Sequence, residues 1–225
     1  MTETRTSKPR TSKPAAATRK PFPWRRVVQV LALVVFIVLL VKGKNQLWML
    51  LFAASAILAI FFGRFYCGWL CPMQTITTVV DDAGRKVHLK KRAIPKWIQH
   101  PAVRIVALVL FLALLALTVV TGRRLPVLPA LAVIAAVLTV FFPAALWHRF
   151  LCPFGTILSL PTRFTKRFLR INQDRCVSCG VCQEVCPGGA ITQDDASLYT
   201  IEQRYCLQCS ECRENCSQQS IDFGG

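Results

Sequence analysis

The chain has 225 residues, of which 53% are hydrophobic, and it carries a formal net charge of +17. A single soluble core would not easily accommodate this combination, so the composition favours a membrane protein. The apolar residues form blocks that hold none of the 11 acidic residues, as membrane-spanning segments do.

The positive charge is distributed unevenly along the chain. Residues 171–225 hold three basic and eight acidic side chains, so this segment is at −5 and the residues before it are at +22. The basic residues follow the ends of apolar blocks, and no nucleic-acid-reading motif accompanies them. This distribution predicts a lipid bilayer as the partner and argues against nucleic acid.

Residues 1–23 are predicted to form a disordered, basic, cytoplasmic tail. They are rich in Thr, Ser, Lys, Pro and Ala, repeat Thr-Ser-Lys-Pro at 6–9 and 11–14, and lack apolar periodicity. A solvated tail attracted to anionic lipid headgroups is favoured over a specific partner site.

Residues 24–169 are predicted to form an all-α transmembrane domain of four helices. Each block is near the ~20 residues that cross the hydrocarbon core, and Pro129 and Pro143 are expected inside the last helix. A cleaved signal peptide would resemble the first block, but no small-residue cleavage site follows it. The four blocks are 27–41, 47–62, 105–122 and 127–147.

The orientation of these helices follows from the Lys and Arg residues between them. The tail, the central loop and the carboxy-terminal segment together hold 24, whereas the two short loops hold four. The positive-inside rule therefore places both termini in the cytoplasm. The chain is predicted to be a multi-pass protein of the cytoplasmic (inner) membrane.

The transmembrane region contains an internal repeat. A shift of 81 residues superimposes the end of the second apolar block on the end of the fourth. We interpret this as a duplicated helical hairpin, whose pseudo-twofold axis along the membrane normal would bring the two copies together. The matched pairs are Phe61 and Phe142, Tyr66 and Trp147, Cys67 and His148, Leu70 and Leu151, Cys71 and Cys152, Pro72 and Pro153, Thr75 and Thr156, and Ile76 and Ile157.

Eight of the 11 cysteines form two runs with the spacing C-x2-C-x2-C-x3-C, 30 residues apart. Zinc modules usually separate two cysteine pairs by a dozen or more residues, so zinc is disfavoured. Disulfides are disfavoured because the predicted topology places these residues on the reducing side of the membrane. The first run is Cys176, Cys179, Cys182 and Cys186, and the second is Cys206, Cys209, Cys212 and Cys216.

The duplicated run resembles the bacterial two-cluster ferredoxin over residues 170–225. This resemblance implies two [4Fe-4S] clusters with crossed ligation, because the fourth cysteine of each run reaches the other cluster. Ser217 stands where the pattern usually has Pro, which we expect to loosen the turn there. Cluster one would take Cys176, Cys179, Cys182 and Cys216, and cluster two would take Cys206, Cys209, Cys212 and Cys186.

Residues 190–192 and 198–201 flank a polar stretch and predict a β-hairpin between the two runs. The segment has few apolar residues, so we expect a small α+β domain that depends on its metal centres for stability.

The other three cysteines lie in a C-x3-C-P motif at 67–72 and an H-x3-C-P motif at 148–153. With these motifs the chain resembles the NapH-like polyferredoxins of periplasmic nitrate respiration and the membrane half of NosR-like proteins. The resemblance runs from about Trp24 to the end and implies four helices and a cytoplasmic two-cluster domain. The family usually has cysteine at the position of His148.

The two motifs together predict a redox or metal site of Cys67, Cys71, His148 and Cys152, provided that the repeats pack as their symmetry suggests. The alternative is that the three cysteines are small packing residues and His148 is a polar anchor. Pro follows Cys71 and Cys152, which predicts that both begin helices, over 73–80 and 154–169, whose N-termini stabilise the thiolates.

These features predict a membrane-bound iron-sulfur protein that passes electrons between the membrane and an unidentified redox partner protein. The family resemblance implies quinol as the redox pool, and aromatic residues gather near the motifs where a quinone headgroup could bind: Phe65, Tyr66, Trp69, Trp147 and Phe150. The acidic carboxy-terminal segment predicts docking to a basic patch on the partner.

Two other functions remain open from the sequence. The chain could be a maturation or reduction factor for copper or iron, with an additional metal at the two motifs. It could also be a transporter or sensory subunit, although its helices lack the buried charges that mark a transport path. No catalytic triad, phosphate loop or paired carboxylate is present. The chain is therefore predicted to be an electron-transfer subunit or a quinol-linked oxidoreductase component rather than a stand-alone enzyme.

Overall fold

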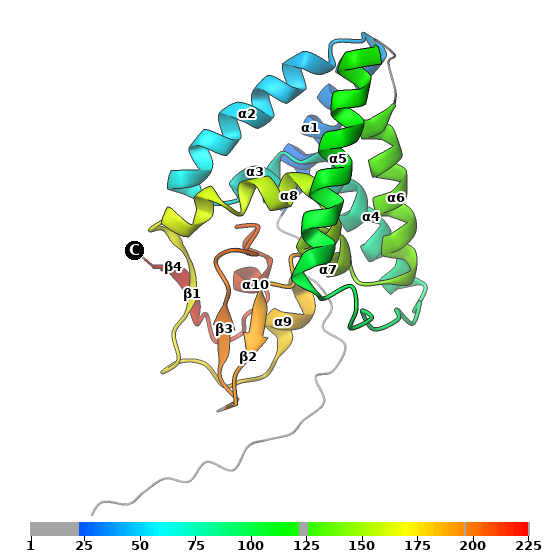
Figure 1. Ribbon diagram of the computed structural model, residues 1–225. Helices are drawn as coiled ribbons and strands as arrows, with labels where there is room; N and C mark the ends of the chain where they lie inside the picture. Colours follow the sequence, from blue (N-terminus) through cyan, green and yellow to red (C-terminus); the bar gives the residue numbers. More distant parts are fainter. Residues whose placement is uncertain (1–22, 122–125, 196, 225) are drawn as a thin grey trace, which may run out of the picture.

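The computed structural model describes residues 23–121, 126–195 and 197–224, so the predicted tail lies almost entirely outside it. Four apolar helices extend to one side of a small β-containing domain (Figure 1). They are α1 (Pro23–Val41), α2 (Asn45–Phe62), α5 (Pro101–Thr121) and α6 (Val127–Phe141).

Two of these helices are long and apolar enough to cross a membrane: α1, and α5 over Pro101–Thr118. Gln46–Phe62 and Val127–Phe141 are apolar but shorter. Only 22% and 6% of the residues in the two longer segments are buried. The chain therefore leaves most of these apolar faces without a partner among its described residues.

The fourth helix is shorter than predicted. It ends at Phe141, Phe142 is extended, and Pro143 precedes the short helix α7 (Ala144–Leu146). The prediction that Pro143 would lie inside a continuous helix to residue 147 was wrong, because proline removes a helical donor and disfavours helix in the preceding residue. Pro129 lies in the first turn of α6, where proline is tolerated.

The two halves of the internal repeat adopt matching structures at their motifs. The short helix α3 (Phe65–Trp69) leads into α4 (Pro72–Lys86), and a π-helical turn (Trp147–Leu151) leads into α8 (Pro153–Leu158). Cys71 and Cys152 are the N-caps of α4 and α8, with φ −70° in both and ψ 119° and 112°. The prediction that each begins a helix is confirmed.

The predicted second helix over 154–169 was only partly correct. α8 ends at Leu158, a 3-10 turn occupies Pro161–Phe164, and the strand β1 starts at Phe168. Pro161 cannot donate to the preceding turn, and the residues after it pair in a sheet instead.

Aromatic rings join the two halves. Phe154 of α8 packs edge to face against Phe52 of α2 and Phe111 of α5, with both centroid distances 5.0 Å. Phe52 also meets Tyr66 of α3 at 5.5 Å. Such edge-to-face pairs are favourable beyond the area that they bury, so they help to fix the middle turns of α2 and α5 around α3 and α8.

The carboxy-terminal domain consists of two antiparallel strand pairs and two short helices. β1 (Phe168–Ile171) pairs with β4 (Ile221–Gly224), and β2 (Ile191–Gln193) pairs with β3 (Tyr199–Ile201). The predicted hairpin is therefore confirmed, with Ile191 opposite Ile201. The helices are α9 (Val181–Val185) and α10 (Glu211–Glu214), each lying within one cysteine run.

A buried ion pair connects α1 to this domain. The Arg25 guanidinium contacts the Glu211 carboxylate, and the two side chains are 2% and 1% exposed. Arg25 also donates to the carbonyl oxygens of Gly68, at 3.2 Å, and of Cys209, at 3.4 Å. One side chain therefore links α1, α3 and the loop of the second cysteine run.

We predict that Glu211→Ala lowers the thermal midpoint of the docked domain, measured by circular dichroism under anaerobic conditions. Removing one member of a buried ion pair leaves an uncompensated charge and costs about 3–5 kcal/mol. The matched control is Arg25→Met with Glu211→Val, because valine stands at the corresponding position 181 of the first run. This double variant should recover much of the loss; a double variant as unstable as Glu211→Ala would contradict the prediction.

Candidate iron-sulfur sites

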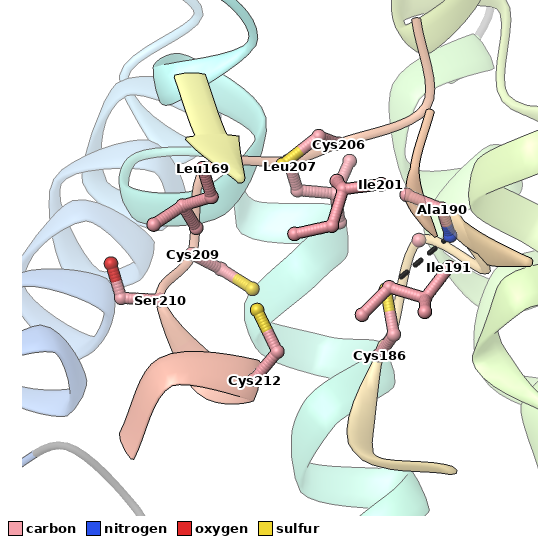
Figure 2. A pocket seen from close by; sticks show the side chains of 11 residues that line it. Leu169, Cys186, Ala190, Ile191, Ile201, Cys206, Leu207, Cys209, Ser210 and Cys212 are labelled. Atoms are coloured by element: carbon pink, nitrogen blue, oxygen red, sulfur yellow. Dashed lines mark hydrogen bonds between the residues drawn. The ribbon is translucent and has the colours of Figure 1, made fainter. Parts of the chain in front are cut away.

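Two cavities lie within the carboxy-terminal domain, and each is lined by four cysteines. The first, which we call the Cys206 cavity, also has walls of Leu169, Ile191 and Ile201. In Figure 2, Cys209 and Cys212 point toward each other across it, and Cys186 enters from the opposite side. Its cysteines are Cys186, Cys206, Cys209 and Cys212.

The second, the Cys176 cavity, also contacts Tyr199, Ser220 and Ile221. The two cavities are similar in size, with empty volumes of about 310 and 340 Å³ when the space that opens to solvent is included. Each takes three cysteines from one run and the last cysteine of the other run, which is the grouping that crossed ligation requires. The cysteines of the second cavity are Cys176, Cys179, Cys182 and Cys216.

The two runs share not only their cysteine spacing but also the positions of their left-handed (positive-φ) residues. In both runs the left-handed residues lie two and four positions after the first cysteine and again 13 positions after it. Alternation of right-handed and left-handed residues turns successive N–H groups toward one concave face, an arrangement that holds anions and occurs at iron-sulfur sites. The residues are Ser178, Gly180 and Gly189 in the first run, and Gln208, Ser210 and Gln219 in the second.

The sulfur atoms already receive protein donors. The Ala190 amide donates to Cys186 Sγ at 3.3 Å, drawn as a dashed line in Figure 2. Burial raises the pKa of the Cys186 thiol to about 11 and that of the Cys206 thiol to about 12. Both are therefore protonated at neutral pH until a metal displaces the proton. The donor set and the loops fit [4Fe-4S] clusters.

The two cavities differ in their exposure. Cys206, Cys209 and Cys212 are buried, whereas Cys179 is exposed, and so is its neighbour Val177. The Cys206 cavity lies against the helical part of the chain, and the Cys176 cavity has a surface that another protein could reach.

The C-x3-C-P motif contacts the loop of the second cysteine run directly. A Cβ atom at Gly68 would overlap the carbonyl oxygen of Leu207 and would lie 3.2 Å from Cα of Cys209. Trp69 Nε1 donates to the Gln208 carbonyl oxygen at 3.1 Å. Only glycine allows so close an approach of two backbones. The C-x3-C-P motif therefore packs directly against the loop of the second cysteine run.

The structure brings together the three cysteines of the two motifs. Cys67, Cys71 and Cys152 are buried in one core that also includes Cys209 and Leu207. Burial, with a contribution from Cys67, raises the pKa of Cys152 to about 11, and burial likewise raises that of Cys71. The expected stabilisation of the two thiolates by helix N-termini is therefore outweighed by burial.

His148 has a different partner. Its Nε2 lies 3.0 Å from Thr77 Oγ1 of α4, and burial, together with the charge of Arg64, lowers its pKa to about 3. The imidazole is therefore neutral. No group of three or more His, Cys, Asp or Glu side chains in the described ranges is arranged to hold a single metal ion. The four-ligand site of Cys67, Cys71, His148 and Cys152 stays a prediction.

Sequence analysis overlooked two charged residues at these sites. Arg64 was counted only as a basic flank, yet its side chain is buried beside Cys67. Glu211 was counted only toward the acidity of the domain, yet it pairs with Arg25. Both carry a signal in the sequence, since Arg64 is a lone charge between an apolar block and a motif, and Glu211 replaces Val181 in the repeat.

Comparison with known families supports the iron-sulfur assignment. Residues 45–90 and 124–172 match one 4Fe-4S binding domain family, and residues 169–192 match a second family of the same description. The first match includes both motifs of the internal repeat, and the second includes the first cysteine run. The chain is a helical iron-sulfur protein with ferredoxin-type 4Fe-4S binding domains.

Three curated relatives illustrate the similarity. The chain is 25% identical over 177 residues to the "Putative electron transport protein YccM" of Escherichia coli (strain K12), covering 68% of this chain and 50% of the relative. It is 29% identical over 138 residues to an uncharacterized protein of Methanocaldococcus jannaschii, covering 59% of this chain and 55% of the relative. It is 27% identical over 227 residues to Protein NirI of Paracoccus denitrificans (strain Pd 1222), covering 78% of this chain and 33% of the relative.

The chain thus spans about half the length of the first two of these relatives, and a third of NirI. No solved structure matches it significantly.

We predict that Gly68→Ala weakens the packing of the second cysteine run against α3. Iron bound by that run should then be more accessible to a chelator. The added methyl group would displace the backbone of Leu207. The rate of iron loss to an added chelator, followed by absorbance, measures the effect. Gly84→Ala is the matched control, since a Cβ there meets only side-chain atoms at 3.6 and 3.8 Å. Equal rates in the two variants would contradict the prediction.

Proposed function

We propose that this chain is a membrane-bound electron-transfer protein that links a quinol pool to a redox partner through two [4Fe-4S] clusters. Each bound cluster would supply reversible one-electron transfer. Cys176, Cys179, Cys182 and Cys216 would hold cluster one, and Cys206, Cys209, Cys212 and Cys186 would hold cluster two. The name of the Escherichia coli relative, which describes electron transport, supports this proposal.

The observation that carries the proposal is the unequal placement of two similar cavities. The loop that lines the Cys206 cavity contacts Gly68 and Trp69 of α3, which follows the end of the apolar helix α2. The Cys176 cavity has Cys179 at the surface. A carrier needs one site near its donor and another accessible to its acceptor, and the chain provides both within one small domain.

The apolar helices support attachment to a bilayer with four crossings. Large apolar side chains such as Ile105, Val109 and Leu117 of α5 are exposed. Contiguous apolar surface of this extent is rare on soluble monomers. The α1–α2 connection lies at the end of the helices remote from the carboxy-terminal domain (Figure 1). With the uneven distribution of Lys and Arg, this arrangement supports a cytoplasmic location for both termini.

A stacked aromatic pair with one exposed member supports the quinol assignment. Phe65 and Trp69 of α3 stack with centroids 5.2 Å apart and ring planes at 19°, and Phe65 is 43% exposed. Tyr66 and Trp147, which the sequence grouped with them, are buried in the core. A flat quinone headgroup would therefore stack on Phe65, adjacent to the residue that holds the Gln208 loop.

The redox partner would dock over the Cys176 cavity. Residues 171–225 carry a net charge of −5, which favours a basic patch on that partner. Electrostatic attraction of this kind chiefly accelerates encounter, so it suits a transient electron-transfer complex.

A second candidate function is maturation or reduction of copper or iron for a respiratory enzyme. The observation in its favour is the common burial of Cys67, Cys71 and Cys152 beside Cys209. Soft thiolate donors bind Cu(I) well.

We predict that cysteine variants reveal crossed ligation. Native protein should contain about eight iron atoms per chain, and Cys216→Ala should leave about four. Because Cys179 and Cys216 serve the same cavity, the double variant Cys179→Ala/Cys216→Ala should also retain about four. Cys209→Ala/Cys216→Ala removes a ligand from each cavity and should lose nearly all iron. The measurement is the iron content of each variant after anaerobic reconstitution. If Cys209→Ala/Cys216→Ala retained about four iron atoms and Cys179→Ala/Cys216→Ala lost nearly all, ligation would instead occur within each run.

We predict that a quinol analogue reduces the full-length protein in lipid nanodiscs, seen as loss of the iron-sulfur absorbance. Phe65→Ala should slow this reduction several-fold because the stacking surface is lost. Trp97→Ala is the control, since Trp97 is an exposed tryptophan in the segment between α4 and α5 and is not part of the Phe65–Trp69 stack.

Clusters that dithionite reduces and the quinol analogue does not would remove the quinol assignment. Copper analysis of the same preparation separates the second candidate function. Copper that is bound by native protein and lost in Cys71→Ala, with iron unchanged, would favour metal maturation over simple electron transfer.

A further inference from the structure

Arg64 is a buried cation whose charge no described carboxylate neutralises. It precedes α3, its side chain is 1% exposed, and it forms no ion pair within the described ranges. Its Nε has no hydrogen-bond partner there. By contrast, two other arginines at this junction pair with carboxylates, Arg25 with Glu211 and Arg149 with Glu202. Arg104 also lies close to Arg64, but it is only partly buried and donates to Thr156 and Ser159.

The guanidinium of Arg64 lies where the two motifs meet the second cysteine run. One terminal nitrogen is 3.4 Å from the carbonyl oxygen of Arg204, two residues before Cys206. The other is 4.0 Å from Cys67 Sγ. The guanidinium carbon packs against Gly155, 3.4 Å from where a Cβ would be. The charge is therefore surrounded by sulfur and backbone rather than by water.

A buried charge of this kind costs several kcal/mol unless an anion lies close by. The anionic group that the chain can offer here is a cluster bound in the Cys206 cavity, whose four thiolates outweigh the positive charge of the iron-sulfide core. The internal repeat gives no equivalent cation, since Ala145 stands 81 residues after Arg64.

We propose that Arg64 is a positioning residue that balances the charge of the cluster in the Cys206 cavity and raises its reduction potential above that of the other cluster. This inference rests on the proposed function, because it requires two bound clusters. A nearby positive charge stabilises the added electron, and net charge near a cluster is one determinant of its potential.

Burial opposes this effect. The cysteines of the Cys206 cavity are more deeply buried than Cys179, and a low dielectric disfavours the more negative reduced cluster. Without Arg64, the cluster nearer to the apolar helices would be the harder one to reduce. With Arg64, it becomes the preferred acceptor of an electron from the quinol side.

The test is a redox titration of the full-length protein, followed by electron paramagnetic resonance, with Arg64→Gln and Arg64→Lys. In Arg64→Gln the potential of one cluster should fall and that of the other should stay unchanged. In Arg64→Lys, which keeps the charge, both should stay near their native values. Titration in a Cys179→Ala background, which keeps only the cluster of the Cys206 cavity, identifies the cluster that shifts. Arg149→Gln/Glu202→Gln is the control, since it removes a cation together with the carboxylate that pairs with it and leaves the net charge unchanged.

Three outcomes would overturn the inference: unchanged potentials in Arg64→Gln, equal shifts of both clusters, or an Arg64→Lys variant that behaves like Arg64→Gln. If Arg64→Gln loses the cluster altogether, recovery of iron in Arg64→Lys but not in Arg64→Met supports the charge role, and failure of both contradicts it. Native protein that binds fewer than two clusters would instead overturn the proposed function.

Discussion

The close backbone contact between Gly68 and the second cysteine run decides how the two parts of this molecule are arranged. A side chain at Gly68 would overlap the Leu207 carbonyl, so the loop can approach only because this position lacks a Cβ. The buried pair of Arg25 and Glu211 then holds α1 against the same loop. Hydrophobic burial alone does not specify orientation, whereas a backbone contact and a buried ion pair do, because both fail when the surfaces shift by an ångström or two.

Both duplications in the chain diverge where their copies face different surroundings. The two cysteine runs share their spacing and their left-handed residues, but Val181 of the first corresponds to Glu211 of the second, which faces Arg25. The two helical motifs share their N-caps, but Cys67 corresponds to His148, which is engaged with Thr77. In each case the backbone is retained and a buried polar residue distinguishes one copy, which gives two similar sites different environments.

Much of this arrangement follows from local patterns, and the rest depends on contacts that no local pattern encodes. The helix starts at Cys71 and Cys152 follow from proline position. The grouping of cysteines around the two cavities is the one that the resemblance to two-cluster ferredoxins implies. The strand at Phe168 could not be read locally, because its partner Gly224 lies over 50 residues away. Likewise, the burial of Arg64 depends on the fold of a distant loop, and composition records it only as one more positive charge.

Crossed sharing of cysteines has a consequence for how the two parts come together. Each cavity draws its fourth cysteine from the other run, so neither run can complete a site alone. The loop that rests on Gly68 is bordered by Cys209, and the cavity behind it is closed by Cys186. A small domain with few apolar residues depends on metal binding for its folding free energy. We therefore expect docking onto the helices to be coupled to completion of both sites, because the loop that contacts Gly68 belongs to the same domain.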